Sequence, residues 1–167
     1  MRTLTILLSF VFLSLGGKCF SQTSASATFT ASATIIRPIG ITTTSNMNFA
    51  GIDAKSGGAV TLRPDNSRST SGDVTLAGSS MVSAATFEVT GEAGFAFSIS
   101  LPQEKYRLSN GSENMLIGDF TSSLEKGGNL VGGSSTVRVG ATLEVNPNQT
   151  PGNYKSTSLM SVTVNYN

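Results

Sequence analysis

The end of the chain alternates strictly between apolar and polar side chains, and this pattern constrains the fold most. One face carries Met160, Val162, Val164 and Tyr166, and the other carries Ser161, Thr163, Asn165 and Asn167. Because successive side chains of a β-strand point to opposite faces, the period of two predicts a strand with one buried face. We expect the free edge of this strand to be paired by another part of the chain or by another molecule.

A glycine and a tyrosine bracket this terminal stretch. Gly152 precedes the penultimate Tyr166 by fourteen positions, with alternating apolar residues between them. This arrangement resembles the C-terminal motif of chaperone–usher pilus subunits. The resemblance implies an incomplete immunoglobulin-like sandwich that is completed by a strand donated from a neighbouring subunit. An ordinary last strand of a β-sandwich is the alternative.

The first 21 residues have the features of a secretory signal peptide. Arg2 precedes an apolar run, Leu4–Leu15, that is too short for a permanent membrane span. Cleavage before Gln22 fits the small residues that precede it. Cys19 is a candidate for lipidation, but the charge of Lys18 disfavours a lipoprotein signal. We therefore expect an exported protein without a stable membrane anchor, in the periplasm, on the cell surface or outside the cell.

Removal of this leader changes the composition of the chain. Of the 167 residues, 146 remain, which is enough for one domain with a sizeable core. Nine basic residues then face ten acidic ones, so the charge does not favour nucleic-acid binding. The only cysteine, Cys19, is lost as well, so no disulfide can form within the exported chain. Many pilus subunits carry a disulfide, and the chain departs from them here.

A second alternating stretch follows the leader. Apolar residues occupy every other position from Ala25 to Ile35, but most are alanines, and Phe29 and Ile35 are the only large ones. One interpretation is the first strand of the sandwich, ending at Arg37-Pro38, and we favour it for Ala33–Ile36. The alternative, for Ala25–Ala31, is an extension that fits into a groove of another subunit.

Two alternating runs in the middle of the chain predict the centre of the core. Ala85–Thr90 and Phe95–Leu101 are joined by a short glycine-bearing link, Gly91–Gly94, which predicts a β-hairpin. We expect four residues of the core strands to be buried: Phe87, Phe97, Val139 and Val162.

The second half of the chain also reads as strands. Met115–Phe120 has apolar spacings that fit a helix as well, but Gly118 and the surrounding pattern favour a strand. Val137–Val145 is a longer alternating run, and Pro147–Gly152 turns the chain into the terminal strand. The whole predicts an all-β fold, an immunoglobulin-like antiparallel β-sandwich of about nine to ten strands. It forms a single domain over 22–167, with 22–31 as a candidate N-terminal extension.

Four separated segments carry a second resemblance, over nearly the whole exported chain. They are Ala33–Ile39, Ala85–Gly91, Val139–Leu143 and Val162–Asn167. Their residues and order resemble the domain of unknown function 4402 (DUF4402) family of exported bacterial proteins, which are similar in turn to spore-coat and pilus-type subunits. The resemblance implies no settled activity and no catalytic residue.

The residues themselves predict no catalytic, metal or cofactor site, and we expect the protein not to be an enzyme. The chain has no histidine, which removes the commonest general base and metal ligand. Glu88 and Glu92 are expected to be solvated, and Asp65-Asn66-Ser67 to be a turn with too few ligands for calcium. The Lys105-Tyr106-Arg107 cluster is more typical of a solvated strand edge than of a polyanion or sugar site.

Two functions of different classes remain. The first is a structural component of a surface appendage or coat, which associates with itself or with partner subunits by β-strand addition. The second is a monomeric secreted binding module for a sugar or another surface ligand. For the first, the sequence offers six candidate assembly residues: Phe29, Gly152, Met160, Val162, Val164 and Tyr166.

Overall fold

The computed structural model describes residues 23–78 and 81–167, and it divides the chain into two units between Thr34 and Ile35. The predicted leader and Gln22 lie outside the described residues. In the first unit, residues 23–34 form no strand and every side chain is exposed, with Phe29 at 92%. We call residues 23–36 the arm. The strand predicted at Ala33–Ile36 is wrong, because no other strand bonds to this stretch, and strand structure begins only at Gly40.

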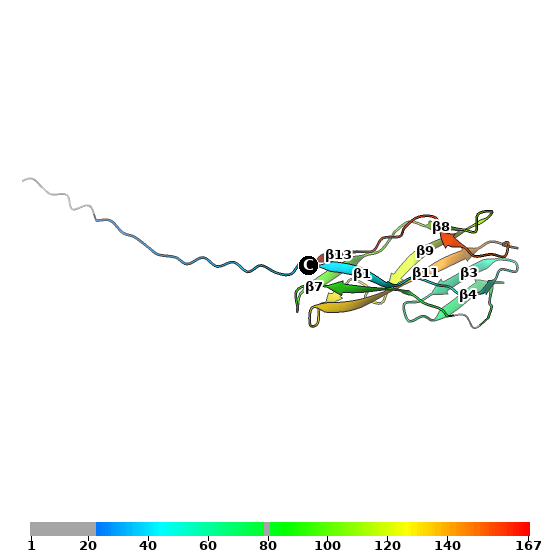
Figure 1. Cartoon of the computed structure of the whole chain (residues 1–167), viewed down its shortest axis with the longest axis horizontal. Coiled ribbons are helices and arrows are strands. Elements are labelled where there is room, and N and C mark those ends of the chain that lie inside the picture. The colour runs from blue at the N-terminus through cyan, green and yellow to red at the C-terminus, as the bar shows by residue number, and fades with distance from the viewer. Residues whose placement is uncertain (1–22, 79–80) are drawn as a thin grey trace, which may run out of the picture. The chain divides into compact units, whose positions relative to one another are not determined.

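The second unit is built only from β-strands in antiparallel sheets (Figure 1). The strands are β1 (Gly40–Ser45), β2 (Ile52–Asp53), β3 (Gly58–Leu62), β4 (Arg68–Gly72), β5 (Thr75–Leu76), β6 (Ala85–Thr90), β7 (Ala96–Ser100), β8 (Tyr106–Ser109), β9 (Asn114–Ser122), β10 (Gly128–Asn129), β11 (Ser134–Val145), β12 (Lys155–Ser156) and β13 (Thr163–Tyr166). The described residues thus hold thirteen strands rather than nine or ten. Four of them, β2, β5, β10 and β12, have only two residues, which is too short for an alternating pattern to be recognised.

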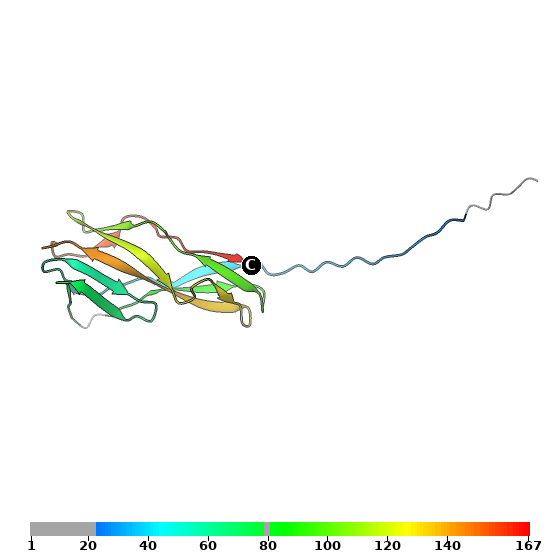
Figure 2. The ribbon, with the colours of Figure 1, turned by 180° about the vertical axis from the view of Figure 1, so that it is seen from behind.

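The large sheet has the order β1-β6-β11-β9-β8-β12, and β3 adds to it between β11 and β4. A smaller sheet, β10-β7-β13, faces it, and β2 and β5 form a separate pair. β11 runs along the sandwich from one end to the other (Figures 1 and 2). Its twelve residues confirm the strand predicted at Val137–Val145, and β9 confirms a strand rather than a helix at Met115–Phe120.

The core has two parts, one toward each end of the sandwich. Val89, Phe97, Leu130 and Val137 are fully buried in the part between β6, β7 and β11. The other part lies on β3, β9 and the second half of β11, and its members include Val60, Leu62, Ile117 and Leu143. Because alternate residues of β11 enter both parts, this strand joins the two halves of the core.

The hairpin predicted from Ala85–Thr90 and Phe95–Leu101 is wrong. β6 pairs with β1 and β11 in the large sheet, whereas β7 pairs with β10 and β13 in the small sheet. The link between them crosses from one sheet to the other, so the apolar faces of the two strands meet inside the sandwich. Val89 and Phe97 are both fully buried there, as the prediction of a core centre required.

Candidate assembly site

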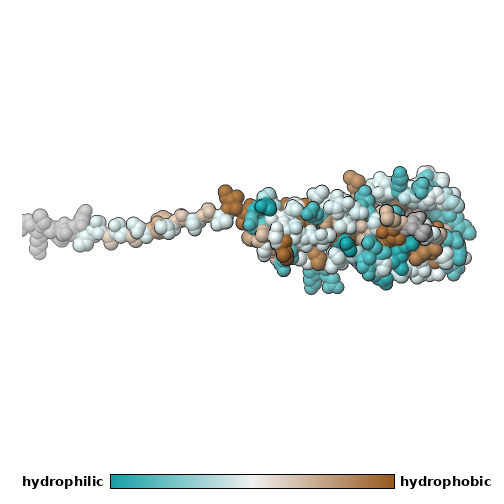
Figure 3. Space-filling model, turned by 60° about the horizontal axis from the view of Figure 1, so that its bottom comes forward, coloured by the Kyte–Doolittle hydropathy of each residue, from teal (hydrophilic) through white to brown (hydrophobic). Residues whose placement is uncertain are grey.

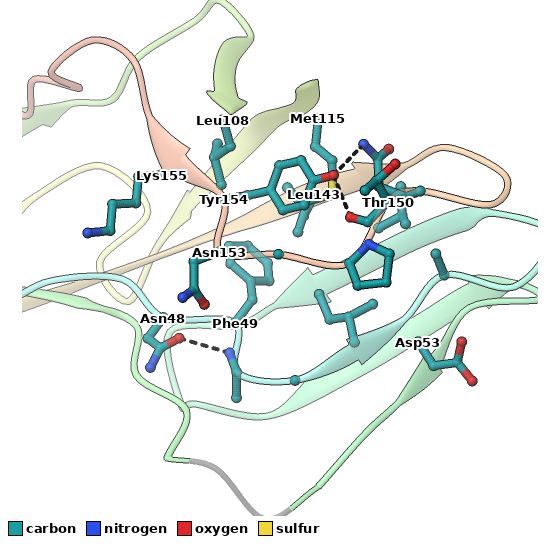
Figure 4. A pocket seen from close by; sticks show the side chains of 18 of the residues that line it. Asn48, Phe49, Asp53, Leu108, Met115, Leu143, Thr150, Asn153, Tyr154 and Lys155 are labelled. Carbon is teal, nitrogen blue, oxygen red and sulfur yellow. Dashed lines mark hydrogen bonds between the residues drawn. The ribbon is translucent and has the colours of Figure 1, made fainter. Parts of the chain in front are cut away.

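Two adjoining cavities open at the surface of the sandwich. The larger, of about 880 Å³, lies between residues 47–55 and 148–155, and its floor includes Leu108, Met115 and Leu143. Figure 4 shows these side chains gathered around the ring of Tyr154. The smaller, of about 170 Å³, has the apolar residues Phe87, Phe120, Val139 and Met160 in its lining.

The two cavities form one groove, which we call the assembly groove. Met47 lines both cavities, so they share a wall. One flank of the groove is formed by 43–55 and the other by 148–162, because each cavity is lined by successive parts of the same two segments. The groove therefore runs between these two segments of the chain.

The flank formed by residues 158–162 presents unbonded backbone. These residues make no hydrogen bond with any other part of the chain that the structure describes, whereas the following residues pair with β7 as β13. The predicted strand from Met160 onward is therefore paired only from Thr163. Its alternation is still visible in the burial, because Met160 and Val162 are half-buried in the groove wall and Ser161 is exposed.

The four residues that we expect to be buried in the core differ in their burial. Phe97 and Val139 are buried as predicted, but Phe87 and Val162 are only half-buried, so the prediction is wrong for these two. Both line the smaller cavity. Leu159, in the same flank, is 93% exposed.

β1 and β13 are both edge strands of the described fold, since β1 pairs only with β6 and β13 only with β7. Asn167 donates its backbone N–H to Ala96 at 3.2 Å, which places alternate backbone groups of β13 toward β7. In an antiparallel ladder, the groups of the intervening residues, Val164 and Tyr166, point to the opposite edge. That edge continues the unbonded flank of the groove.

A hydrogen-bonded clamp holds the junction between the arm and β1. The Oη of Tyr166 donates to the carbonyl of Arg37 at 2.8 Å and accepts the N–H of Glu92 at 2.6 Å. The N–H of Arg37 in turn donates to a carboxylate oxygen of Glu92 at 2.9 Å. A side chain at Gly91 would collide with the Tyr166 hydroxyl, and the ring of Phe95 packs edge-on against that of Tyr166.

A second network holds the loop that borders the larger cavity. The carboxylate of Glu113 accepts hydrogen bonds from the Oγ1 and N–H of Thr150, at 2.6 and 2.9 Å, and from Gln149 at 2.9 Å. The bonds from Thr150 hold the pKa of Glu113 below its ordinary value. The hydroxyl of Tyr154 donates to the carbonyl of Thr150 at 2.7 Å (Figure 4).

The predicted assembly residues fall in different places. Met160 and Val162 line the smaller cavity, Val164 and Tyr166 continue the same flank in β13, and Gly152 borders the larger cavity. Phe29 lies in the arm, in the other unit. Sequence reasoning missed Met47 and Phe87 in the groove and Glu113 beside it.

The other polar candidates have structural roles. The carboxylate of Asp65 accepts the N–H of Ser67 at 2.9 Å, and hydrogen bonding from Ser67 lowers the pKa of Asp65, as expected for a turn. Lys105 forms an ion pair with Glu144 on the surface. Within residues 23–78 and 81–167, no three acidic, histidine or cysteine side chains are grouped to hold a metal ion.

Outside the groove, the surface carries both hydrophilic and hydrophobic side chains. The face in Figure 3 is largely hydrophilic or neutral, and its hydrophobic side chains form small, separate patches. Scattered exposed hydrophobic residues are normal on protein surfaces. No helix long and apolar enough to span a membrane occurs in the described part of the chain.

The described residues form an all-β sandwich with a groove in its surface. The chain belongs to the DUF4402 family, because the family model, described as a domain of unknown function, matches residues 39–166. The match covers β1 to β13 and excludes the arm. No curated protein and no solved structure matches the chain.

Proposed function

We propose that this protein is an exported, non-catalytic structural subunit of a bacterial surface appendage or coat, assembled by β-strand addition. The observation that carries the proposal is the unbonded backbone of residues 158–162 beside an uncovered part of the core. Unpaired strand edges are templates for a strand from another chain. A strand added here would bond to the flank and bury the half-exposed side chains of Phe87 and Val162.

The arm supports the proposal because it has the pattern of a strand without a partner. Its apolar residues alternate with serine and threonine, and none of residues 23–34 is buried. Leaving a side chain as large as Phe29 in water forgoes about 1.5–3 kcal/mol of burial free energy. Export is supported by the leader-like composition of residues 1–21, and a non-catalytic role by the lack of histidine.

The proposal is tested by the mass of the exported chain in solution. We expect a chain that begins at Gln22 to form multimers in size-exclusion chromatography with light scattering, at concentrations that rise into the millimolar range. A chain lacking residues 22–30 should remain folded by circular dichroism and run as a monomer. In the full-length chain, Phe29→Ser should weaken association, whereas the matched control Thr28→Ser should not.

A strictly monomeric full-length chain, together with a deletion that unfolds, would make the arm the protein's own first strand. The alternative function would then take precedence. It is a monomeric binding module for a sugar or another surface ligand, favoured by the larger cavity of about 880 Å³ at the loop end of the sandwich. Its polar lining includes Asn48, Asp53, Asn153 and Lys155. A panel of oligosaccharides that raises the melting temperature of the arm-less chain would support it.

A further inference from the structure

The methionines of the chain lie in three different environments, and two of them lie in the assembly groove. The part of the chain that the structure describes holds four: Met47, Met81, Met115 and Met160. Met115 is buried, with 8% exposure, and Met81 is 88% exposed. Met47 and Met160 are half-buried, and both line the smaller cavity. We call these two the groove methionines.

We infer that the groove methionines are oxidation sites that control strand addition. A peroxide would convert their thioethers to sulfoxides, and the oxidised subunit would bind an added strand much more weakly. This inference rests on the proposed function and adds its regulation and the residues that are modified. It is independent of which strand enters the groove, because both methionines belong to the subunit that accepts it.

Met47 lies where the two cavities of the groove meet. It lines both of them, and it packs against both parts of the core. It belongs to the segment between β1 and β2, next to Asn48, which forms an isolated bridge with Ser83. A strand that covers the smaller cavity would therefore cover the side chain of Met47 as well.

Met160 lies in the flank whose backbone is unbonded. Residues 158–162 make no hydrogen bond with any other described part of the chain, and Met160 contributes to the lining of the smaller cavity while Ser161 is exposed. Directly opposed residues of paired strands share a face of the sheet. A strand that bonds to this flank would therefore bury Met160 beside its own apolar side chains.

An oxidant can enter the smaller cavity before a strand has been added. The cavity has a volume of about 170 Å³ and opens at the surface. A cavity needs only about 10–15 Å³ to hold one water molecule, so this one has room for hydrogen peroxide beside the groove methionines. An added strand would fill this space. We therefore expect the two sulfurs to react in the unassembled subunit and to be protected in the assembled one.

The reaction is a two-electron oxidation of each thioether. The sulfur lone pair attacks one oxygen of hydrogen peroxide, so the S–O bond forms as the O–O bond breaks. The departing hydroxide takes the proton of the transferred hydroxyl group and becomes water. Each sulfur is oxidised to a sulfoxide, and each peroxide molecule is reduced to water.

The sulfoxide is polar in a groove that is mostly apolar. The lining of the smaller cavity includes Phe87, Phe120, Val139 and Val162. In the open groove water bonds to the sulfoxide oxygen, but an added strand would displace that water. Burying a polar group without a new partner is unfavourable, and we expect oxidation to weaken association about tenfold to a hundredfold.

Oxidation of the chain that begins at Gln22 with hydrogen peroxide tests the inference. Peptide mass spectrometry measures the oxidation of each methionine over time, and size-exclusion chromatography with light scattering measures association in the same samples. We expect Met81 to react first and Met115 last, and the loss of multimers to follow the groove methionines. Methionine sulfoxide reductases of both epimer specificities should restore the multimers.

Variants separate the groove methionines from the other two. Leucine keeps the apolar volume of methionine, so the double variant M47L/M160L should associate equally well before and after oxidation. The matched control M81L should lose its multimers on oxidation, as the parent does. Without any oxidant, M160Q should weaken association about tenfold, whereas M81Q should not. Circular dichroism checks that each chain is folded.

The other outcomes distinguish the inference from the proposed function. Equal association of the reduced parent and of a parent oxidised at both groove methionines would refute the inference and leave the proposed function intact. Oxidation that unfolds M47L/M160L would assign the effect to Met115 and also refute the inference. A reduced parent that is monomeric at every concentration would refute the proposed function, and the control of assembly with it.

Discussion

The hydroxyl of Tyr166 donates a hydrogen bond to the carbonyl of Arg37 at 2.8 Å, which joins residues 129 positions apart in the sequence. Glu92 completes the clamp by donating its N–H to that hydroxyl and accepting the N–H of Arg37. Tyr166 is thereby bonded to the residue that directly follows the arm. The terminal tyrosine acts through its hydroxyl as well as through its ring.

Removing this hydroxyl should destabilise the domain. We expect Tyr166→Phe to lower the free energy of unfolding by about 1–2 kcal/mol, because it deletes two hydrogen bonds and keeps the ring packed on Phe95. Tyr106→Phe is the matched control, since the Tyr106 hydroxyl bonds to no other described residue. It should change the free energy of unfolding by less than about 0.5 kcal/mol. Equal urea midpoints for the two variants would argue against the clamp.

Phe97 fills the centre of one half of the core and is fully buried. Phe97→Ala should lower the free energy of unfolding by about 3–5 kcal/mol, because it leaves a cavity among Val89, Leu130 and Val137. Phe29→Ala removes the same atoms from an exposed site, so in dilute monomer it should have an effect within about 0.5 kcal/mol. Thermal and urea unfolding of both variants measure the difference, and a Phe97→Ala variant as stable as the parent would contradict the burial.

Stability in acid should depend on Glu113. Hydrogen bonds from Thr150 lower its folded pKa below the unfolded value near 4.5. The unfolded state therefore binds a proton first as the pH falls. The contribution is complete above the unfolded pKa and is lost as the pH falls through the folded pKa. We expect Glu113→Gln to flatten the dependence of stability on pH below about 4.5.

The control for this variant is Glu125→Gln, which changes an exposed loop carboxylate that forms no hydrogen bond with another described residue. It should leave the acid limb of the stability curve unchanged. Urea midpoints between pH 2 and 6 provide the measurement. An unchanged acid limb for Glu113→Gln would mean that the Thr150 bonds do not persist in solution.

Two glycines should respond differently to a methyl group. A Cβ at Gly140 would collide with the carbonyl of Leu62 and the backbone of Arg63, neither of which can move without disturbing β11. Gly140→Ala should therefore destabilise the domain by about 1–3 kcal/mol. At Gly152 the added atom meets only the Asn110 side chain, at 3.2 Å and beyond, so Gly152→Ala should be tolerated. Differential scanning calorimetry of both variants decides between these outcomes.

The strands were predictable because their signal is local. Alternation marks a buried face whatever lies beyond it, and it located β6, β7 and β11. It does not say which sheet the next strand joins, so the pattern after Thr90 predicts a hairpin turn, whereas the chain crosses there from one sheet to the other. Gly91 is required there by the Tyr166 hydroxyl, a contact that no local pattern contains.

The groove was only partly predictable for a related reason. Met160 and Val162 alternate with polar residues as regularly as Val164 does, yet only Val164 lies in a paired strand. The alternation of apolar and polar residues indicates which face of a strand is buried. It does not indicate whether another strand bonds to the edge of that strand. The free edge and the half-buried Phe87 became visible only when all pairings were known.

β11 exchanges neighbours along one of its edges, pairing with β6 up to Val139 and with β3 from Ala141. One continuous strand thus contributes Val137 to one half of the core and Leu143 to the other. If β11 loses its structure, both halves of the core lose their packing together, because the same strand contributes to both. We therefore expect the two halves to melt in a single cooperative transition, and anything that occupies the groove to raise the melting temperature of the whole sandwich.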